Sequence, residues 1–224
     1  MNVVIFGASG MVGQGVLLEC LRDSDVEHVL VIGRSSAGRP HAKLREVIVK
    51  DLFDVVSYAE ELTGLDACFF CLGVSAAGMT EAAYRHLTYD LTVAVAQEIA
   101  ARNPALCFVY VSGAGTDSTE HGRTMWARVK GATENALLRM PFRSAFMFRP
   151  GVIQPLDGIR SKTRAYRLLY VLAAPVLPLL RRAFPNSILT TREIGQAMLA
   201  VARNGWPRPV LEAKDIHAAA TRKP

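Results

Sequence analysis

Short apolar runs alternate with longer amphipathic segments along roughly the first two thirds of the chain. Runs of three to six apolar residues are typical of buried strands, and apolar positions spaced three or four apart are typical of helices. The pattern predicts strands at 3–6, 29–32, 47–49, 67–72, 106–111 and 145–148. It predicts helices directly after residue 10 and at about 54–62, 80–102 and 124–139. Because such strands are apolar on both faces, we expect an α/β fold with a doubly wound parallel sheet.

The alternation ends after residue 151, and the remaining chain predicts a smaller C-terminal region. Segment 160–183 is basic, then apolar, then basic, and its apolar part at 168–180 is too short to span a bilayer. It is interpreted either as a lid packed on the sheet or over a substrate cleft, or as a weak membrane-surface contact. A last helix is expected from 191 to 203, with Ile194, Met198 and Val201 facing inward. We therefore expect one domain, with a core at 1–155 and a lid or substrate region at 156–224.

Composition and charge restrict the kinds of partner. The chain has 224 residues, of which 50% are hydrophobic and 21% are charged, with a formal net charge of +6. This is ordinary globular composition, and the basic balance permits anionic ligands. The Lys and Arg residues are scattered, so no nucleic-acid partner is expected. The start of the chain lacks a basic segment followed by an apolar one, so it does not resemble a secretory signal, and a cytoplasmic location is expected.

The four cysteines are expected to be free thiols, as is usual in a reducing compartment. Cys68 and Cys71 form a C-x-x-C pattern within a predicted buried strand. An odd spacing on a strand sends two side chains to opposite faces. We therefore expect two core positions here, with neither a redox pair nor a metal site.

A glycine pattern follows the first predicted strand and opens the first helix. Gly7, Gly10 and Gly13 form G-x-x-G-x-x-G, so no side chain blocks the approach of a phosphate at this turn. The amino end of the helix offers unpaired N–H groups and positive dipole to that phosphate. The motif predicts a dinucleotide site that binds the pyrophosphate through the turn residues, which are Gly7, Ala8, Ser9, Gly10, Met11 and Val12.

The end of the second predicted strand bears on the choice of dinucleotide. A site for NAD usually has a carboxylate about 20 residues after the glycines, where it binds the ribose 2′-hydroxyl. Here Arg34 follows Gly33 and precedes Ser35, and a guanidinium can bind a 2′-phosphate in a bidentate manner. We expect these three residues to contact the cofactor and to favour NADP(H), with NAD(H) as the alternative.

The ends of the other parallel strands should line the same crevice. We expect Asp51 and Leu52 beside the adenine. Segment 71–73, with Cys71, Leu72 and Gly73, is expected under the ribose. The nicotinamide should be bordered by Ser112 and by segment 150–152, which comprises Pro150, Gly151 and Val152.

The sequence resembles the short-chain dehydrogenase/reductase superfamily. The resemblance rests on G-A-S-G-M-V-G at 7–13, I-G-R at 32–34, V-Y-V-S at 109–112, K-G at 130–131 and R-P-G at 149–151. It covers about residues 2–155 and is strongest to atypical and extended members, the NAD-dependent epimerase/dehydratase and Tat-interacting oxidoreductase-like proteins. The resemblance implies a Rossmann fold, a nicotinamide cofactor, a small-molecule substrate, and a homodimer formed through the helices at 80–102 and 124–139.

In that superfamily a tyrosine four residues before a lysine carries the proton transfer, the lysine holds the ribose, and a serine orients the substrate. Lys130 and Ser112 match the lysine and the serine, so the resemblance implies catalytic roles for them. The tyrosine position holds Trp126. An indole N–H donates a hydrogen bond but does not exchange a proton near neutral pH. Trp126 is interpreted either as a stacking platform for a flat ligand or as a core residue.

Three hypotheses for function follow. In the first, the chain is an oxidoreductase for a small carbonyl or alcohol compound, and the apolar segment 168–180 suggests an apolar one. Another proton carrier is then drawn from Tyr166, Tyr170, Asp117 or His121. Alternatively, Lys130 itself moves the proton because desolvation lowers its pKa. As a third hypothesis, the chain is a non-catalytic NADP(H)-binding redox sensor.

Overall fold

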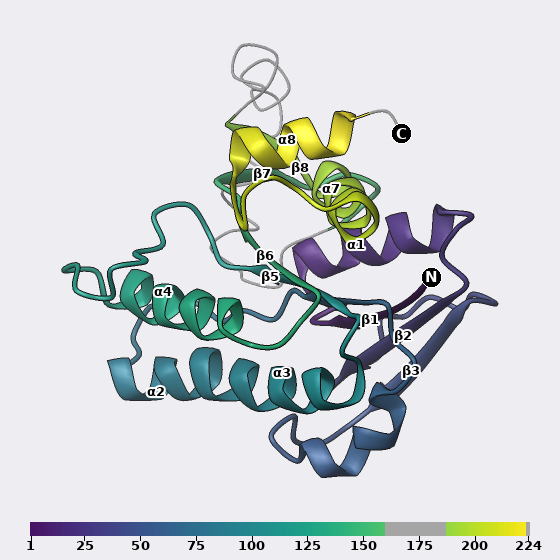
Figure 1. Cartoon of the computed structure of the whole chain (residues 1–224), viewed down its shortest axis with the longest axis horizontal. Coiled ribbons are helices and arrows are strands. Elements are labelled where there is room, and N and C mark those ends of the chain that lie inside the picture. Colours follow the sequence, from purple (N-terminus) through teal and green to yellow (C-terminus); the bar gives the residue numbers. More distant parts are fainter. Residues whose placement is uncertain (160–186, 223–224) are drawn as a thin grey trace.

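A computed structural model of the chain describes residues 1–159 and 187–222. In the described part, a seven-stranded sheet has the order β3-β2-β1-β4-β5-β6-β9, and every neighbouring pair is parallel (Figure 1). Its strands are β1 (Asn2–Phe6), β2 (His28–Gly33), β3 (Leu44–Ile48), β4 (Ala67–Phe70), β5 (Cys107–Val111), β6 (Ser144–Arg149) and β9 (Val210–Glu212). A separate parallel pair joins β7 (Val152–Gln154) to β8 (Ile188–Thr190).

Helices cover both faces of this sheet (Figure 1). One layer consists of α1 (Met11–Arg22), α7 (Thr191–Asn204) and α8 (Ala213–Thr221). The other consists of the 3-10 helix η1 (Val55–Leu62), α2 (Glu81–Arg85), the π-helical turn η2 (His86–Asp90), α3 (Leu91–Arg102) and α4 (Met125–Leu138). The predicted doubly wound α/β fold is confirmed.

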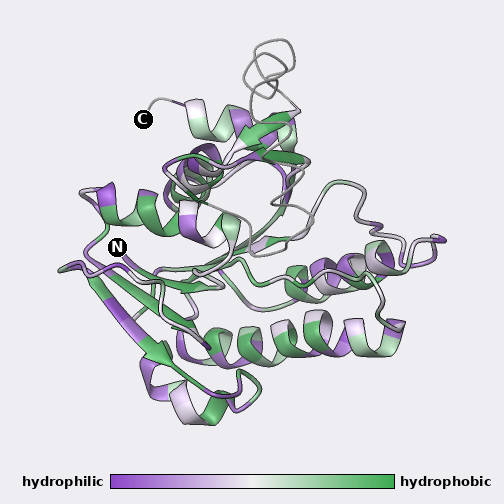
Figure 2. Cartoon of the chain, turned by 180° about the vertical axis from the view of Figure 1, so that it is seen from behind, coloured by the Kyte–Doolittle hydropathy of each residue, from purple (hydrophilic) through white to green (hydrophobic). Residues whose placement is uncertain are grey.

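Strand β1 shows why the sheet is covered on both faces. Val3 and Ile5 belong to the apolar cluster that includes residues of α1, α7 and α8, whereas Val4 and Phe6 belong to the cluster that includes residues of η1, α3 and α4. Successive side chains of a strand point to opposite faces, so a continuous apolar run supplies both cores. Figure 2 shows the hydrophobic colour running along the central strands.

The two cysteines of the C-x-x-C pattern lie on opposite faces of the sheet, as predicted. Cys68 belongs to the cluster beside α3, and Cys71 packs against the cluster beside α1. All four cysteines are free. Burial raises the pKa of the Cys68 thiol well above its usual range and that of the Cys71 thiol to about 12. Such thiols remain protonated at neutral pH, so they behave as small apolar side chains.

Several strands and helices begin or end at other residues than predicted. The strand predicted at 47–49 begins at Leu44, because this edge strand pairs with β2 from Leu44 onward despite its polar Arg45 and Glu46. The strand predicted at 67–72 ends at Phe70, and the following residues Cys71 and Leu72 pass close to Gly7. The helix predicted at 80–102 contains the π-helical turn η2, and the one at 54–62 is a 3-10 helix.

Four elements were missed, namely β7, β8, β9 and α8, so the helix beginning at Thr191 is not the last. The three strands have three residues each, which is too short for a periodic signal. No helix among the described residues is long and apolar enough to cross a membrane. The predictions for Tyr166, Tyr170 and segment 160–183 lie outside the described residues.

Candidate cofactor and active site

The turn between β1 and α1 is built so closely that glycine is required at two positions. Gly7 has a φ of +82°, and a Cβ added there would lie 2.7 Å from the backbone of Cys71 and Leu72. A Cβ on Gly13 would lie 2.2 Å from the carbonyl oxygen of Gly7. The backbone N–H of Gly10 donates to that same oxygen at 2.9 Å. The backbone at Gly7 is therefore packed directly against residues 71–72, just after β4, and against α1.

Gly10 is the N-cap of α1 and makes no side-chain capping hydrogen bond. The first N–H groups of a helix have no acceptor within the helix, and together with the helix dipole they form an anion site. A turn with glycine at positions 7 and 10 that ends at this helix fits a pyrophosphate.

A groove of about 390 Å³ opens beside this turn, at the carboxyl edge of the sheet. It is lined by Gly7, Ser9, Gly10, Met11, Arg34, Asp51, Leu52, Phe53, Cys71, Leu72, Gly73, Val74, Leu87 and Leu91. An adjoining hollow of about 290 Å³ shares five of these residues and adds Ala8, Val31, Ile32, Gly33 and Ser35. The structure thus brings together the predicted residues from the ends of β1, β2, β3 and β4.

Arg34 is exposed and lines both the groove and the adjoining hollow. Its guanidinium makes no hydrogen bond or ion pair with any other described residue. The loop that follows it is fixed, because Glu46 accepts hydrogen bonds from the Ser36 hydroxyl at 2.7 Å and from the Ala37 N–H at 2.6 Å. The backbone next to Arg34 is therefore fixed, and the N–H groups of its guanidinium are available to bind an anion.

The other end of the groove is apolar and was largely missed by sequence reasoning. Phe53 stacks on His86 with ring centroids 4.3 Å apart and planes 7° apart. Leu87 and Leu91 enter the lining from the π-helical turn and the start of α3. The Asp51 carboxylate accepts the Phe53 N–H at 2.9 Å and so shapes the strand end. Of these apolar residues, only Phe53 could have been predicted from the sequence, because it directly follows the predicted Asp51 and Leu52.

Lys130 and Trp126 lie one turn apart on α4, and both are partly buried. The Trp126 ring packs on Gly115, because a Cβ added to Gly115 would lie 3.6 Å from it. The Lys130 ammonium donates to the carbonyl oxygen of Ser112 at the end of β5. Burial lowers the pKa of Lys130 to about 8, and the nearby carboxylate of Glu134 opposes that shift.

The Ser112 side chain turns away from solvent and is only 6% exposed. Its hydroxyl donates to Glu134 at 2.5 Å and also lies 3.1 Å from the carbonyl oxygen of Phe148. Its hydroxyl proton is thus engaged by a buried carboxylate. Neither Ser112 nor Lys130 lines the two hollows at the glycine turn, and the same holds for Val12 and for segment 150–152.

Two of the proposed proton carriers, Asp117 and His121, lie in the loop between β5 and α4. The Asp117 carboxylate accepts hydrogen bonds from the Thr119 hydroxyl at 2.6 Å and from the Gly122 N–H at 2.6 Å. The bond from Thr119, followed by that from Gly122, holds the pKa of Asp117 below its ordinary value. Asp117 is thus a poor proton carrier, because it stays ionised and braces its own loop. His121 is exposed in the same loop.

A hollow of about 450 Å³ lies elsewhere, between α1, α7 and α8. Its charged side chains pair with one another: Arg203 with Asp23 at 2.5 Å and Arg22 with Glu19 at 2.7 Å. Although this hollow is larger than the groove, most of its charged side chains are already paired and it has no helix amino end. The groove at the glycine turn is therefore the better ligand site.

Known proteins resemble the chain in sequence. No model of a known protein family matches it. The mitochondrial protein fmp52 of Aspergillus clavatus is 30% identical over 175 residues, covering 73% of this chain and 70% of the relative. Protein fmp52, mitochondrial, of Emericella nidulans is 29% identical with the same coverage. Protein HTATIP2 of Rattus norvegicus is 28% identical, covering 68% of this chain and 62% of the relative.

Solved structures share the fold. An oxidoreductase of the short-chain dehydrogenase/reductase family from Burkholderia thailandensis superposes with a TM-score of 0.68 at 17% identity, covering 97% and 92% of the two chains. A putative NAD-dependent epimerase/dehydratase from Bacillus halodurans gives 0.64 at 15% identity, covering 97% and 99%. The Bordetella bronchiseptica enzyme WbmH, solved with NAD⁺, gives 0.65 at 16% identity, covering 94% and 74%. The predicted resemblance to this superfamily is confirmed in the fold.

The expected cytoplasmic location is wrong, because the fmp52 relatives are named mitochondrial. Segments that direct import into mitochondria are amphipathic and rich in Arg and Ser, unlike an apolar secretory signal. The lack of a secretory pattern therefore does not indicate a cytoplasmic location.

Proposed function

The chain belongs to the family of the fmp52 proteins and shares the fold of the short-chain dehydrogenase/reductase proteins, and on that premise we propose that it is an NADP(H)-dependent oxidoreductase for a small, apolar carbonyl or alcohol compound. The observation that carries the proposal is the exposed Arg34 beside the closely built glycine turn. The fold supports a nicotinamide dinucleotide, and Arg34 supports the choice of NADP(H) over NAD(H).

The residues present fit such a cofactor. The turn would hold the pyrophosphate, because Gly7 and Gly13 let it pack closely against the neighbouring backbone and lead directly into the amino end of α1. The whole proposed binding set is Gly7, Ala8, Ser9, Gly10, Met11, Val12, Gly33, Arg34, Ser35, Asp51, Leu52, Cys71, Leu72, Gly73, Ser112, Lys130, Pro150, Gly151 and Val152. When bound, NADP(H) supplies or accepts hydride.

Arg34 would distinguish the two cofactors by binding the 2′-phosphate. Charge-assisted hydrogen bonds contribute about 1.5–3 kcal/mol, which corresponds to roughly tenfold or more in affinity. The variant Arg34→Ala should therefore bind NADPH about tenfold more weakly and NADH unchanged. Arg39→Ala is a matched control, because Arg39 is exposed in the same loop but lines neither hollow. If Arg34→Ala weakens binding of both cofactors, or of neither, this role of Arg34 in choosing NADP(H) is contradicted.

Lys130 would carry the proton in place of the superfamily tyrosine. It lies one turn after Trp126, which cannot exchange a proton, and its pKa near 8 suits both donation and acceptance near neutral pH. A panel of aldehydes, ketones and quinones, with NADPH oxidation followed by absorbance, tests for turnover. Activity that Lys130→Ala leaves unchanged on every accepted substrate would refute this role.

A non-catalytic redox sensor is the second candidate, and Trp126 is the observation that favours it. If NADPH binds saturably while every compound of the panel is inert, the sensor is the better account. Trp126 would then serve as a packing residue over Gly115.

The proposal also includes a homodimer formed through α2, α3 and α4, which pack on one another at one side of the sheet (Figure 1). Light scattering after size exclusion would show a monomer if this is wrong. The division at residue 155 and the lid or membrane-surface contact at 160–183 stay predictions.

A further inference from the structure

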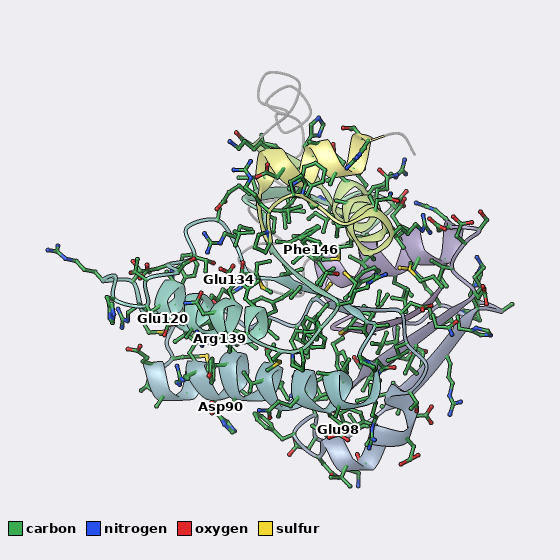
Figure 3. All side chains as sticks on the ribbon, viewed as in Figure 1. Asp90, Glu98, Glu120, Glu134, Arg139 and Phe146 are labelled. Atoms are coloured by element: carbon green, nitrogen blue, oxygen red, sulfur yellow. The ribbon has the colours of Figure 1, made fainter. Side chains whose placement is uncertain are left out.

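Glu134 is a buried carboxylate on α4, one turn after Lys130, and its side chain is 1% exposed. In Figure 3 it lies between α4 and the strands, whereas Glu98 lies on the far side of α3 from α4. Burying a carboxylate is unfavourable unless it is paired and hydrogen-bonded. The neighbours of Glu134 must therefore supply the ion pair and the hydrogen bonds that stabilise its charge.

Three elements converge on this carboxylate. Arg149, at the end of β6, donates through Nε to Oε1 at 3.0 Å and through Nη2 to Oε2 at 2.5 Å. Ser112, just after β5, donates its hydroxyl to Oε1. The carbonyl oxygen of the same Ser112 accepts the Lys130 ammonium. Ser112 thus connects the carboxylate to the amine, through its side chain on one side and its backbone on the other.

The charges in this cluster act in opposite directions on Lys130. Burial disfavours its charged form, and the negative charge of Glu134 favours it. Glu134 also balances Arg149, which pairs in addition with the partly exposed Glu212 at 3.3 Å. Tyr110, on β5, is buried and its phenol stays neutral because burial raises its pKa. The only anion described as facing Lys130 is therefore Glu134.

We propose that Glu134 is a positioning residue, which holds Lys130 as a cation against the end of β5 so that the amine can donate a proton at the active site. The consequence for catalysis rests on the proposed function, whereas the effect on Lys130 does not. Glu134 acts through Ser112 and Lys130 and has no contact with the groove itself.

The test is the acid dissociation of Lys130 in the cofactor-free protein. The protein is labelled with acetic anhydride from pH 6 to 11, and mass spectrometry follows acetylation of Lys130, with exposed Lys50 and Lys214 as internal references. We expect a midpoint near 8 for the wild type. In Glu134→Gln, which keeps the shape but not the charge, the midpoint should fall by about one unit.

Two variants separate positioning from general disturbance. Glu134→Asp keeps the charge and should restore most of the shift. Glu98→Gln removes a carboxylate from the outer side of α3, where Glu98 pairs with Arg102, and should leave the midpoint unchanged. If Glu134→Gln does not fold, the double variant Glu134→Leu with Arg149→Met removes both buried charges and is measured instead. A smaller downward shift is then expected, because loss of the Arg149 cation acts in the opposite direction.

A midpoint that stays within a few tenths of a unit of the wild type, or that rises, would overturn the proposal. The same variants are then titrated with NADPH and assayed with an accepted substrate across the same pH range. A fall in the pH of half-maximal turnover for Glu134→Gln supports the proposal. If no cofactor binds, the proposed function fails, and the labelling result still decides the role of Glu134.

Discussion

Removing Arg149 should destabilise the protein far more than removing an exposed arginine. Its side chain is 11% exposed and makes a two-bond contact with Glu134, which is 1% exposed. The variant Arg149→Met leaves that carboxylate buried without the cation that is hydrogen-bonded to it. Breaking a buried ion pair by removing one partner costs about 3–5 kcal/mol, because the remaining charge is uncompensated. For a domain of this size each kcal/mol lowers Tm by about 2–4 °C, so the expected loss is about 6–20 °C.

Urea denaturation, followed by circular dichroism, and calorimetry would measure this loss. Arg45→Met is the matched control, since Arg45 is 69% exposed and its pairing with Glu61 should contribute at most about 1 kcal/mol. The double variant Glu134→Leu with Arg149→Met removes both charges and should recover much of the stability. A loss below about 1 kcal/mol for Arg149→Met, or a double variant as unstable as the single one, would refute the reasoning.

Three further predictions concern the glycine turn, the active-site amine and a core thiol. Gly13→Ala should abolish NADPH binding and lower the free energy of unfolding by about 1–3 kcal/mol, because its Cβ would lie 2.2 Å from the Gly7 oxygen. Gly10→Ala should have a smaller effect in the same NADPH titrations and thermal melts, because its Cβ would lie 3.3 Å from that oxygen. Lys130 is charged in the folded and unfolded states below pH 8, but above it the folded state deprotonates first and loses the burial penalty. The free energy of unfolding should therefore rise between about pH 8 and 10, and Lys130→Met should flatten that rise in urea melts. Cys71, with a pKa near 12, should resist iodoacetamide at pH 7.5 or so and react only after denaturation.

The sequence predicts best what is local along the chain. The glycine turn, the following helix and Arg34 are contiguous with their strands, so their spacing alone placed them in the groove. The apolar end of the groove was missed because Leu87 and Leu91 reach it from a helix that lies far along the chain. Their inward positions also depend on the π-helical turn, which changes the helical spacing.

Pairing between distant residues explains the other failures. Strand β9 has three residues, and only its pairing with Met147–Arg149 of β6 makes it a strand. In the sequence, Glu134 has the pattern of an exposed helix residue. Its burial depends on Arg149, which comes 15 residues later and belongs to another element. Neither partner can be identified before the sheet is assembled.

An equilibrium titration of the pure protein with NADPH and, separately, with NADH tests the central claim most directly. Energy transfer from Trp126 to a bound reduced nicotinamide provides the signal. The account predicts saturable binding of both cofactors, with NADPH bound about tenfold or more tightly because Arg34 adds charge-assisted hydrogen bonds. Equal affinities would contradict the role of Arg34, and binding of neither cofactor would contradict the assignment of the groove.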